Sequence, residues 1–345
     1  MGGLNPYNKY RILSYYKEML DLSYGKIPYP RMAIWYPSYI CNQRCVYCMY
    51  KDYIDTETYI SVDDSKRVFK QLDSVGVEGI ELCGGGDAFT NPNIYDILKY
   101  GINNYSFKFG ALTNGVLLTD ELIRLIIEHF SYIRISLDNI DSEEYIKQRR
   151  PIAHSDSVVV LENIRKLVDL KNNLNTGCLI GVKILLTKPD EDIIRNVVDF
   201  CKKSGVDSVQ FKVAEYINQE RNSVFENGER LKSVVDSLQS DKLPILFSFK
   251  KTYIYTKCKM SPLQLTIDPL GDVYICCYYQ HRRDSHFIGN LLKDNLIDFW
   301  GKKEHRAKIE GITSSECNVW NCRFHGYNDF YNNVFLKDKM QLQFC

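Results

Sequence analysis

Apolar and polar residues alternate along this chain with two periods, one typical of strands and one typical of helices. Short apolar runs, such as MAIWYPSYI at 32–40 and GIELC at 79–83, are typical of buried strands. Between them, apolar residues recur every three or four positions, as in TDELIRLIIEHF at 119–130, which predicts amphipathic helices. Ser61 and Thr119 stand where two such helices would begin, and both are favourable N-cap residues. This alternation predicts parallel βα units.

Six strands of this kind are expected in the first 215 residues. They lie at 32–40, 79–83, 107–115, 132–138, 179–187 and 208–213. Six βα units fit an open doubly wound sheet or a partial barrel, and in both folds ligands bind at the C-terminal ends of the strands. Polar features follow the first four strands: a three-cysteine loop, GGGD, TNG, and the pair Ser136 and Asp138. We therefore expect one site where these features meet.

The composition is that of a globular protein without a strong electrostatic character. Of the 345 residues 45% are apolar and 25% are charged, and the formal net charge is +1. Such a charge does not favour nucleic acid or an anionic membrane as a partner. No apolar run is long enough to span a bilayer, and the N-terminus lacks the apolar core of a signal peptide. We expect a cytoplasmic protein.

The cysteines indicate metal or redox chemistry, because the chain contains 12 of them and disulfides are rare in a reducing compartment. Three of them, Cys41, Cys45 and Cys48, lie in the segment CNQRCVYC that follows the first strand. Three thiolates on one short loop can hold three irons of a [4Fe–4S] cluster and leave the fourth iron open. The alternative is a zinc loop completed by a distant Cys or His.

The cysteine loop resembles the cluster loop of the radical S-adenosylmethionine (radical SAM) superfamily. GGGDAF at 84–89, ALTNG at 111–115 and IRISLD at 133–138 are also similar to segments of that family, so the resemblance covers roughly residues 32–215. It implies an α/β fold with a partial (β/α)6 TIM-type barrel. It also implies that SAM binds to the open iron and is cleaved to a 5′-deoxyadenosyl radical, which abstracts a hydrogen from the substrate.

The same resemblance implies which residues contact SAM. Tyr47, before the third cysteine, is expected near the adenine, and the glycine-rich segment is expected at the amino group. Ser136 and Asp138 are expected near the ribose, and Arg149 is expected at the carboxylate. The motif departs from the family pattern, since Asp87 replaces the usual Glu and Ala88 the usual Pro. The full set of expected cofactor contacts is Tyr47, Gly84, Gly85, Gly86, Asp87, Asn114, Ser136, Asp138 and Arg149.

A second group of cysteines lies in the last quarter of the chain. Residues 258–279 predict a β-hairpin with the turn DPLGD, with Cys258 before it and Cys276 on its second strand. Cys317 and Cys322 follow the segment 295–311, which is predicted to be helical. The arrangement resembles the auxiliary-cluster extension called SPASM, in its shortened form called Twitch. It implies one auxiliary [4Fe–4S] cluster on Cys258, Cys276, Cys317 and Cys322.

Two alternatives stay open for this second group. Cys277 could replace Cys276 as a ligand, and the cysteines could form a small zinc site that His325 joins. The expected division of the chain is an N-terminal helical lead-in at 1–31, the radical SAM partial barrel at 32–215, a linker with helix at 216–250, the Twitch/SPASM-like domain at 251–330, and a C-terminal tail at 331–345.

The expected function is a radical SAM enzyme that oxidises or epimerises a carbohydrate-like or other small polar substrate, with electrons from a donor such as flavodoxin or ferredoxin. Oxidation would use the auxiliary cluster as electron acceptor, whereas epimerisation would need a thiol as hydrogen donor. Cys83, Cys178, Cys277 and Cys345 are the spare thiols. Maturation of a ribosomally made peptide is the alternative, disfavoured by the short segment before Cys41. A non-catalytic iron–sulfur redox sensor is the alternative from another class.

Overall fold

A single ten-stranded sheet organises the molecule. The computed structural model describes residues 9–214, 220–248, 258–312, 322 and 324–336. The strand order is β10-β9-β8-β1-β2-β3-β4-β5-β6-β7. All neighbours from β8 through β7 pair in parallel, whereas β8–β9 and β9–β10 pair antiparallel. The strands are β1 (Met32–Trp35), β2 (Gly79–Leu82), β3 (Lys108–Thr113), β4 (Phe130–Ser136), β5 (Leu179–Leu186), β6 (Ser208–Val213), β7 (Ile245–Ser248), β8 (Gln264–Ile267), β9 (Asp272–Tyr274) and β10 (Phe287–Asn290).

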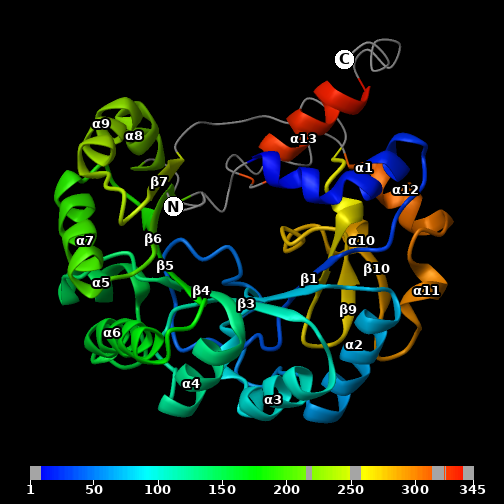
Figure 1. The fold of residues 1–345 in the computed structure, drawn as a ribbon, viewed down its shortest axis with the longest axis horizontal. Helices are drawn as coiled ribbons and strands as arrows, with labels where there is room; N and C mark the ends of the chain where they lie inside the picture. Colours follow the sequence, from blue (N-terminus) through cyan, green and yellow to red (C-terminus); the bar gives the residue numbers. More distant parts are fainter. Residues whose placement is uncertain (1–8, 215–219, 249–257, 313–321, 323, 337–345) are drawn as a thin grey trace.

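Helices alternate with the first strands and cover the outer side of the sheet. In Figure 1 the strands form an incomplete ring with α2, α3, α4, α6 and α7 outside it, which confirms the partial barrel of six βα units. The helices are α1 (Tyr16–Ser23), α2 (Val62–Ser74), α3 (Ile94–Asn104), α4 (Asp120–His129), α5 (Ser142–Arg149), α6 (Asp156–Leu174), α7 (Glu191–Ser204), α8 (Glu220–Glu226), α9 (Gly228–Leu238), α10 (Arg283–His286), α11 (Leu296–Phe299), α12 (Lys303–Gly311) and α13 (His325–Tyr331). Short 3₁₀ turns occupy Lys9–Tyr15, Ala88–Thr90 and Ser261–Leu263, and a π-helical turn occupies Asn332–Leu336.

Two helices begin at the N-cap residues that the sequence predicts, Ser61 and Thr119. The Ser61 hydroxyl accepts a hydrogen bond from the backbone N–H of Asp64 at 3.1 Å, and the Thr119 hydroxyl accepts one from Leu122 at 3.3 Å. Each hydroxyl satisfies an N–H group that has no partner within the first turn of its helix. None of the described helices is long and apolar enough to cross a membrane.

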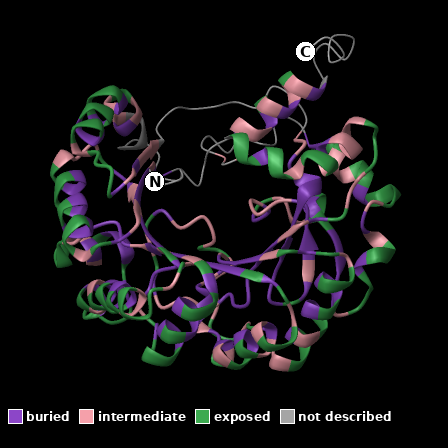
Figure 2. Ribbon diagram, in the orientation of Figure 1, coloured by how far each residue is buried: buried purple, intermediate pink, exposed green. Residues whose placement is uncertain are grey.

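The two faces of the sheet differ in character. Alternate strand residues, such as Ile135, Ile184 and Phe211, point outward and form one large core with the helices. In Figure 2 the helices around the ring are accordingly buried mainly on the side that faces the sheet and exposed on the other. On the concave face, Ile34 and Tyr36 pack with residues near the C-terminal hairpin in a separate cluster. The concave face of β4 to β6 is polar, which gives the barrel a mixed interior.

The C-terminal part is joined to the barrel more closely than the sequence suggests. Strand β8 pairs in parallel with β1, so the predicted hairpin of β8 and β9 extends the barrel sheet. The segment 216–250, expected as a linker with helix, contains α8, α9 and the edge strand β7. Residues 331–336, expected as the beginning of a tail, are helical and pack against the N-terminal helix.

Candidate active site

The three-cysteine loop follows β1 and is docked on the C-terminal end of α5. The backbone N–H of Arg44 donates to the carbonyl of Arg149 at 3.1 Å, and that of Val46 donates to Gln148 at 3.0 Å. Arg150 ends the helix in the left-handed conformation, with φ of 44°. The loop therefore has a fixed place at the C-terminal end of the first strand, where a βα barrel binds its ligands.

Each thiol of the loop has a hydrogen-bond donor beside it. The backbone N–H groups of Gln43 and Tyr50 donate to the sulfurs of Cys41 and Cys48, two residues earlier in each case. Burial raises the pKa of Cys41 to about 12 and that of Cys48 to about 11, so without a metal both thiols stay neutral. Such donors stabilise the thiolate charge that forms when a metal displaces the proton. The loop therefore fits a metal–thiolate cluster.

Arg149 links Cys45, the remaining cysteine of the loop, to Asp138 at the end of β4. Its Nη1 lies 3.9 Å from the sulfur of Cys45, and its Nε lies 2.6 Å from Oδ2 of Asp138 in a buried ion pair. Tyr47 donates its hydroxyl hydrogen to the same carboxylate, and the guanidinium lies 5.9 Å from the centre of the Tyr47 ring. Burial raises the pKa of Asp138, and Arg149 opposes that shift. Arg149 thus supports the cysteine loop, and its contact with the SAM carboxylate stays a prediction.

The glycine-rich segment packs against the chain that leads into the cysteine loop. A Cβ on Gly86 would lie 1.8 Å from the carbonyl oxygen of Ile40, and one on Gly84 would lie 2.5 Å from the ring of Tyr36. The backbone N–H of Asp87 donates to the Ile40 carbonyl at 2.8 Å. The absence of side chains here lets the glycine-rich segment and the chain before the cysteine loop approach each other at backbone distance. Whether the glycines also approach SAM stays a prediction.

Asp87 ties the glycine-rich segment to the end of β3. Its carboxylate accepts hydrogen bonds from the Thr113 hydroxyl at 2.8 Å, from the Asn114 backbone N–H at 2.7 Å and from the Phe89 backbone N–H at 3.0 Å. Burial raises the pKa of Asp87, while these donors counteract the shift. With its oxygens engaged by the chain, the carboxylate holds two loops in register, and its predicted contact with SAM is untested.

Three residues of this site, Asn42, Gln43 and Tyr145, were not among the predicted ones. Asn114 donates its side-chain amide hydrogen to Asn42 at 2.7 Å, which links the TNG turn to the cysteine loop. Gln43 is buried and donates to the Tyr145 hydroxyl on α5 at 2.7 Å. Asn42 and Gln43 stand between two of the cysteines, and two adjacent amides in a metal-binding loop are a signal that could have indicated them. Ser136 ends β4 as predicted and is partly exposed there.

The second group of cysteines comes together around one small cavity. The described predicted ligands Cys258, Cys276 and Cys322 all line it, and its wall is completed by residues such as His286 and Phe324. Cys317, the fourth predicted ligand, lies outside the described residues. The structure thus brings together the three predicted ligands that it describes, although the cluster assignment itself stays a prediction.

The sulfurs of this cavity accept hydrogen bonds in the same way as those of the first loop. The backbone N–H of Tyr278 lies 3.4 Å from the sulfur of Cys276, and that of Phe324 lies 3.4 Å from that of Cys322, again two residues apart. The side-chain amide of Asn328 lies 3.7 Å from the sulfur of Cys258. Donors directed at each of these sulfurs fit thiolates that carry charge on a cluster.

Cys277 does not line this cavity, although its thiol is hydrogen-bonded to that of Cys276. It packs in the concave-face cluster with Tyr36 and Tyr50, and its carbonyl accepts hydrogen bonds from both hydroxyls, at 3.1 and 2.8 Å. This placement supports Cys276 over Cys277 as the predicted ligand. In the described part of the chain, no three Cys, His, Asp or Glu residues converge as the ligands of a single ion would. A four-iron cluster needs no such convergence, because each thiolate binds a different iron.

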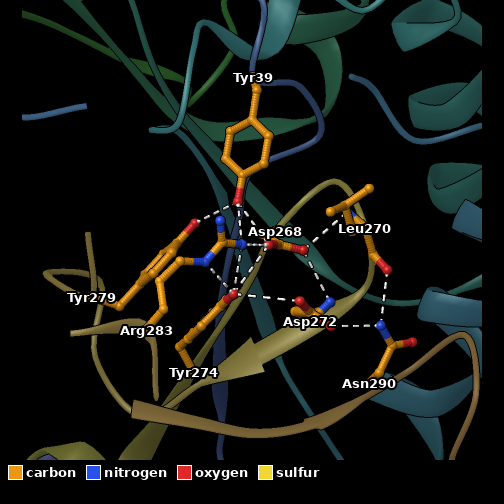
Figure 3. Close-up of polar contacts among 8 residues, drawn as sticks. All are labelled: Tyr39, Asp268, Leu270, Asp272, Tyr274, Tyr279, Arg283 and Asn290. Atoms are coloured by element: carbon orange, nitrogen blue, oxygen red, sulfur yellow. Dashed lines mark hydrogen bonds and ion pairs between the residues drawn. The ribbon is translucent and has the colours of Figure 1, made fainter. Parts of the chain in front are cut away.

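A buried carboxylate connects the two cysteine sites. Asp268, in the turn between β8 and β9, accepts hydrogen bonds from the hydroxyl of Tyr39 at 2.7 Å and from Arg283 at 2.8 Å (Figure 3). Its other oxygen accepts the backbone N–H groups of Leu270 and Asp272 within the turn. The Tyr39 ring lies beneath Gly85, where a Cβ would be 2.9 Å away. The hairpin before the second site is thereby anchored to the loops of the first.

Comparison with protein families agrees with these two sites. Residues 35–197 match the profile described as the radical SAM superfamily, and residues 258–323 match the SPASM profile, described as an iron–sulfur cluster-binding domain. Together the two matches cover about two thirds of the chain. A radical SAM domain binds a [4Fe–4S] cluster and SAM, and a SPASM domain binds auxiliary iron–sulfur clusters.

Individual relatives are distant. A GTP 3′,8-cyclase from Clostridium perfringens is 29% identical over 174 residues, which are 48% of this chain and 50% of that protein. The chain therefore matches about half the length of these cyclases. A protein from Pyrococcus furiosus that modifies the cofactor of a tungsten-containing aldehyde ferredoxin oxidoreductase is 22% identical over 299 residues, covering 81% of this chain and 80% of that protein.

Solved structures share the fold at low sequence identity. SuiB from Streptococcus suis, bound to its precursor peptide SuiA, superimposes with a TM-score of 0.69 at 16% identity, over 94% of this chain and 76% of that one. The protein anSMEcpe with bound AdoMet superimposes with a TM-score of 0.61 at 13% identity, over 81% of this chain and 83% of that one. These likenesses establish the fold.

Proposed function

The chain belongs to the radical SAM superfamily and is therefore an enzyme, and we propose that it oxidises or epimerises a small polar substrate bound inside the barrel. When bound, the first cluster and SAM supply a 5′-deoxyadenosyl radical that removes a hydrogen atom from the substrate. The protein has to bind both molecules, orient them and exclude water. The enzyme class removes the non-catalytic redox sensor from consideration.

We assign the first cluster to Cys41, Cys45 and Cys48. This assignment is supported by the docking of the loop on α5 and by the hydrogen-bond donors beside the sulfurs. Because Asp87 is already bonded to the ends of two loops, we assign the contact with SAM on this side to the backbone of the glycine-rich segment rather than to the carboxylate. Asp138 and Arg149 are assigned the role of holding Tyr47 and Cys45 in place.

The observation that carries the substrate assignment is the polarity of the concave face. Most strand residues that point inward from β2, β4, β5 and β6 have polar or charged side chains. A small polar molecule would find hydrogen-bond partners there, which an apolar substrate would leave unsatisfied at a cost. The polar residues of this face include Glu81, Tyr132, Arg134, Lys183, Gln210 and Lys212.

The placement of the spare thiols bears on the type of reaction. Cys83 and Cys277 belong to the concave-face cluster, whereas Cys178 and Cys201 lie in the core beneath the helices. Cys345 lies outside the described residues. An epimerase needs a hydrogen donor facing the substrate, so Cys83 and Cys277 are its two candidates. An oxidase needs an electron acceptor instead, which we assign to the cavity of Cys258, Cys276 and Cys322.

The electron that starts the reaction has to come from outside the chain. We propose a one-electron donor protein such as flavodoxin or ferredoxin, in a cytoplasmic setting that keeps the thiols reduced. Maturation of a peptide is the second candidate for the reaction, and the carbohydrate-like class is one of several small polar substrates that the concave face would accept.

The test is made on protein purified without oxygen and reconstituted with iron and sulfide. We expect about eight irons per chain, falling to about four when Cys41, Cys45 and Cys48 are replaced by Ala. We also expect 5′-deoxyadenosine from SAM under reduction, made by the unaltered protein and not by the triple variant. The Cys201→Ala variant is the matched control, since its thiol is buried beneath the helices and should leave both values unchanged.

Two results would overturn parts of this proposal. About four irons in the unaltered protein, all lost in the triple variant, would remove the auxiliary cluster. Iron without SAM cleavage would contradict the assignment of the cysteine loop.

A separate experiment distinguishes the two substrate classes. We expect deuterium transfer into 5′-deoxyadenosine from labelled small polar compounds but not from labelled peptides.

A further inference from the structure

Three cationic side chains share the concave face of adjacent strands. The parallel register pairs Ser136 of β4 with Lys183 of β5, and Lys183 with Gln210 of β6. Arg134 stands two residues before Ser136, and Lys212 stands two residues after Gln210. Because side chains alternate between the faces of a strand, Arg134, Lys183 and Lys212 all point to the concave side.

The neighbouring residues confirm this direction. Ile135, Ile184 and Phe211, which alternate with the three cations, are buried in the core on the helix side. A Cβ on Gly181 would lie 3.6 Å from Cγ of Arg134, so the arginine side chain crosses β5 where that strand has no side chain. Arg134 Nη1 reaches Oε1 of Gln210 on the next strand at 3.4 Å.

Among the residues that the structure describes, more cations than acids act on Lys183. Burial, followed by repulsion from Lys212 and Arg134, lowers the pKa of Lys183 to about 7. Asp138 acts in the opposite direction, but its carboxylate is already paired with Arg149 at 2.6 Å and accepts the backbone N–H of Leu185 at 2.8 Å.

A second acid of the described concave face, Glu81, is also engaged. Glu81 on β2 accepts the hydroxyl hydrogen of Tyr132 on β4. Lys183 itself makes no hydrogen bond or ion pair with another residue in the part of the chain that the structure describes. A half-buried lysine beside two other cations is destabilised by their repulsion, so a structural role alone does not account for Lys183.

We propose that Arg134, Lys183 and Lys212 bind a phosphoryl group of the substrate. This inference rests on the proposed function, because it narrows the small polar substrates to phosphorylated ones. A phosphate monoester carries between one and two negative charges near pH 7 and offers three acceptor oxygens, which suits one guanidinium and two ammonium groups. The cations lie toward the C-terminal ends of β4 to β6, beside Ser136, so the rest of the substrate would extend toward the cysteine loop.

Binding is tested without reductant, on the reconstituted protein with SAM present, using inorganic phosphate as the probe and calorimetry as the readout. We expect saturable binding that weakens about tenfold or more in Lys183→Gln and in Lys212→Gln. The control is Lys108→Gln, because Lys108 shares this face but is exposed at the opposite end of β3. It should bind phosphate like the unaltered protein.

A second readout keeps the test independent of folding. Removing the half-buried lysine and its repulsion from Arg134 and Lys212 in Lys183→Met should raise the midpoint of thermal unfolding in the absence of phosphate, whereas loss of a purely structural lysine would lower it. No binding of phosphate, or equal binding of succinate, would overturn the phosphoryl assignment. Weaker binding of SAM in Lys183→Gln would overturn it too, since the cations would then hold the SAM carboxylate. Neither measurement requires radical formation. Failure of the phosphate test can therefore be distinguished from failure of SAM cleavage, which would contradict the proposed function.

Discussion

At the scale of single residues, the buried carboxylates of the site are bonded to neighbouring loops of the protein. Asp87 holds the glycine-rich segment to the end of β3, and Asp138 holds Arg149 beside Cys45. Asp138 does so with φ of 64°, a region that is unfavourable for residues other than glycine. The ion pair and the backbone hydrogen bond from Leu185 maintain this conformation. Substitutions at these positions should therefore affect the geometry of the cysteine loop.

Gly86→Ala is expected to disrupt the contact between the two ligand-binding loops. The added Cβ would meet the carbonyl oxygen of Ile40 at 1.8 Å, and backbone cannot move aside as a side chain can. We expect a loss of about 3 kcal/mol or more in unfolding free energy and lower iron in the first cluster. The control is Gly177→Ala, where a Cβ would meet nothing within 4 Å. Equal stability of the two variants would contradict the close approach.

Asp138→Asn is expected to leave Arg149 as a buried charge without its partner. The loss should be about 3 kcal/mol in unfolding free energy, with faster release of iron from the reconstituted protein. Asp63→Asn removes an exposed carboxylate that pairs with Lys66 on the surface of α2, and it should change neither value. An unaltered rate of iron release in Asp138→Asn would mean that Arg149 holds Cys45 without help from Asp138.

At the scale of elements, the turn between β8 and β9 connects the two cysteine sites. Predicted from its Pro and Gly, the turn also carries Asp268, whose side chain is completely buried. The same carboxylate binds Tyr39 of the first site and Arg283 after the hairpin. Tyr274 and Tyr279 stack beside it with ring centres 3.8 Å apart. This element thus fixes the position of Cys276 relative to the barrel.

Asp268→Asn is expected to weaken that connection. Asparagine keeps an acceptor for the turn but removes the charge that compensates Arg283, which should cost about 2 kcal/mol. Auxiliary-cluster iron should fall while the first cluster is retained, which iron analysis and electron paramagnetic resonance can separate. The control is Asp294→Asn, an exposed residue on the loop after β10. Loss of both clusters together would show that the turn supports the barrel as a whole.

At the scale of the whole molecule, the first and last described α-helices, α1 and α13, pack together with the segment that leads into β8. Met19 of α1 is fully buried against Tyr331 of α13 and against Met260, two residues after Cys258. The same cluster includes Leu263 at the entrance to β8. Contacts between segments so far apart in the sequence give the second site a frame that the hairpin alone would not supply.

Met19→Ala is expected to loosen that frame. Truncation of a fully buried methionine costs about 2–5 kcal/mol, and the cavity should propagate to Met260 and Cys258. Lower unfolding stability and reduced auxiliary-cluster iron should appear together. Leu13→Ala is the control, because Leu13 lies on the same N-terminal segment but is exposed. A stability loss without a change in iron would confine the effect to the helices.

The sequence by itself determined the features that depend on local pattern. Periodicity predicts the βα order and the helix starts at Ser61 and Thr119, and the spacing of Cys41, Cys45 and Cys48 predicts the first cluster-binding loop. These follow because helix caps, strand alternation and chelating loops depend on residues only a few positions apart. The family resemblance was confirmed by the two family profiles, whereas the individual SAM contacts stay predictions.

Only the tertiary structure decided which distant residues meet. It joined β8 to β1, placed Asp268 against Tyr39, and brought Cys322 to Cys258 and Cys276. It also divided the spare thiols between the concave face and the helix-side core, and aligned Arg134, Lys183 and Lys212 across three strands. Side-chain pairing across a sheet depends on register, and the register of strands separated by whole helices is set by packing of the complete core.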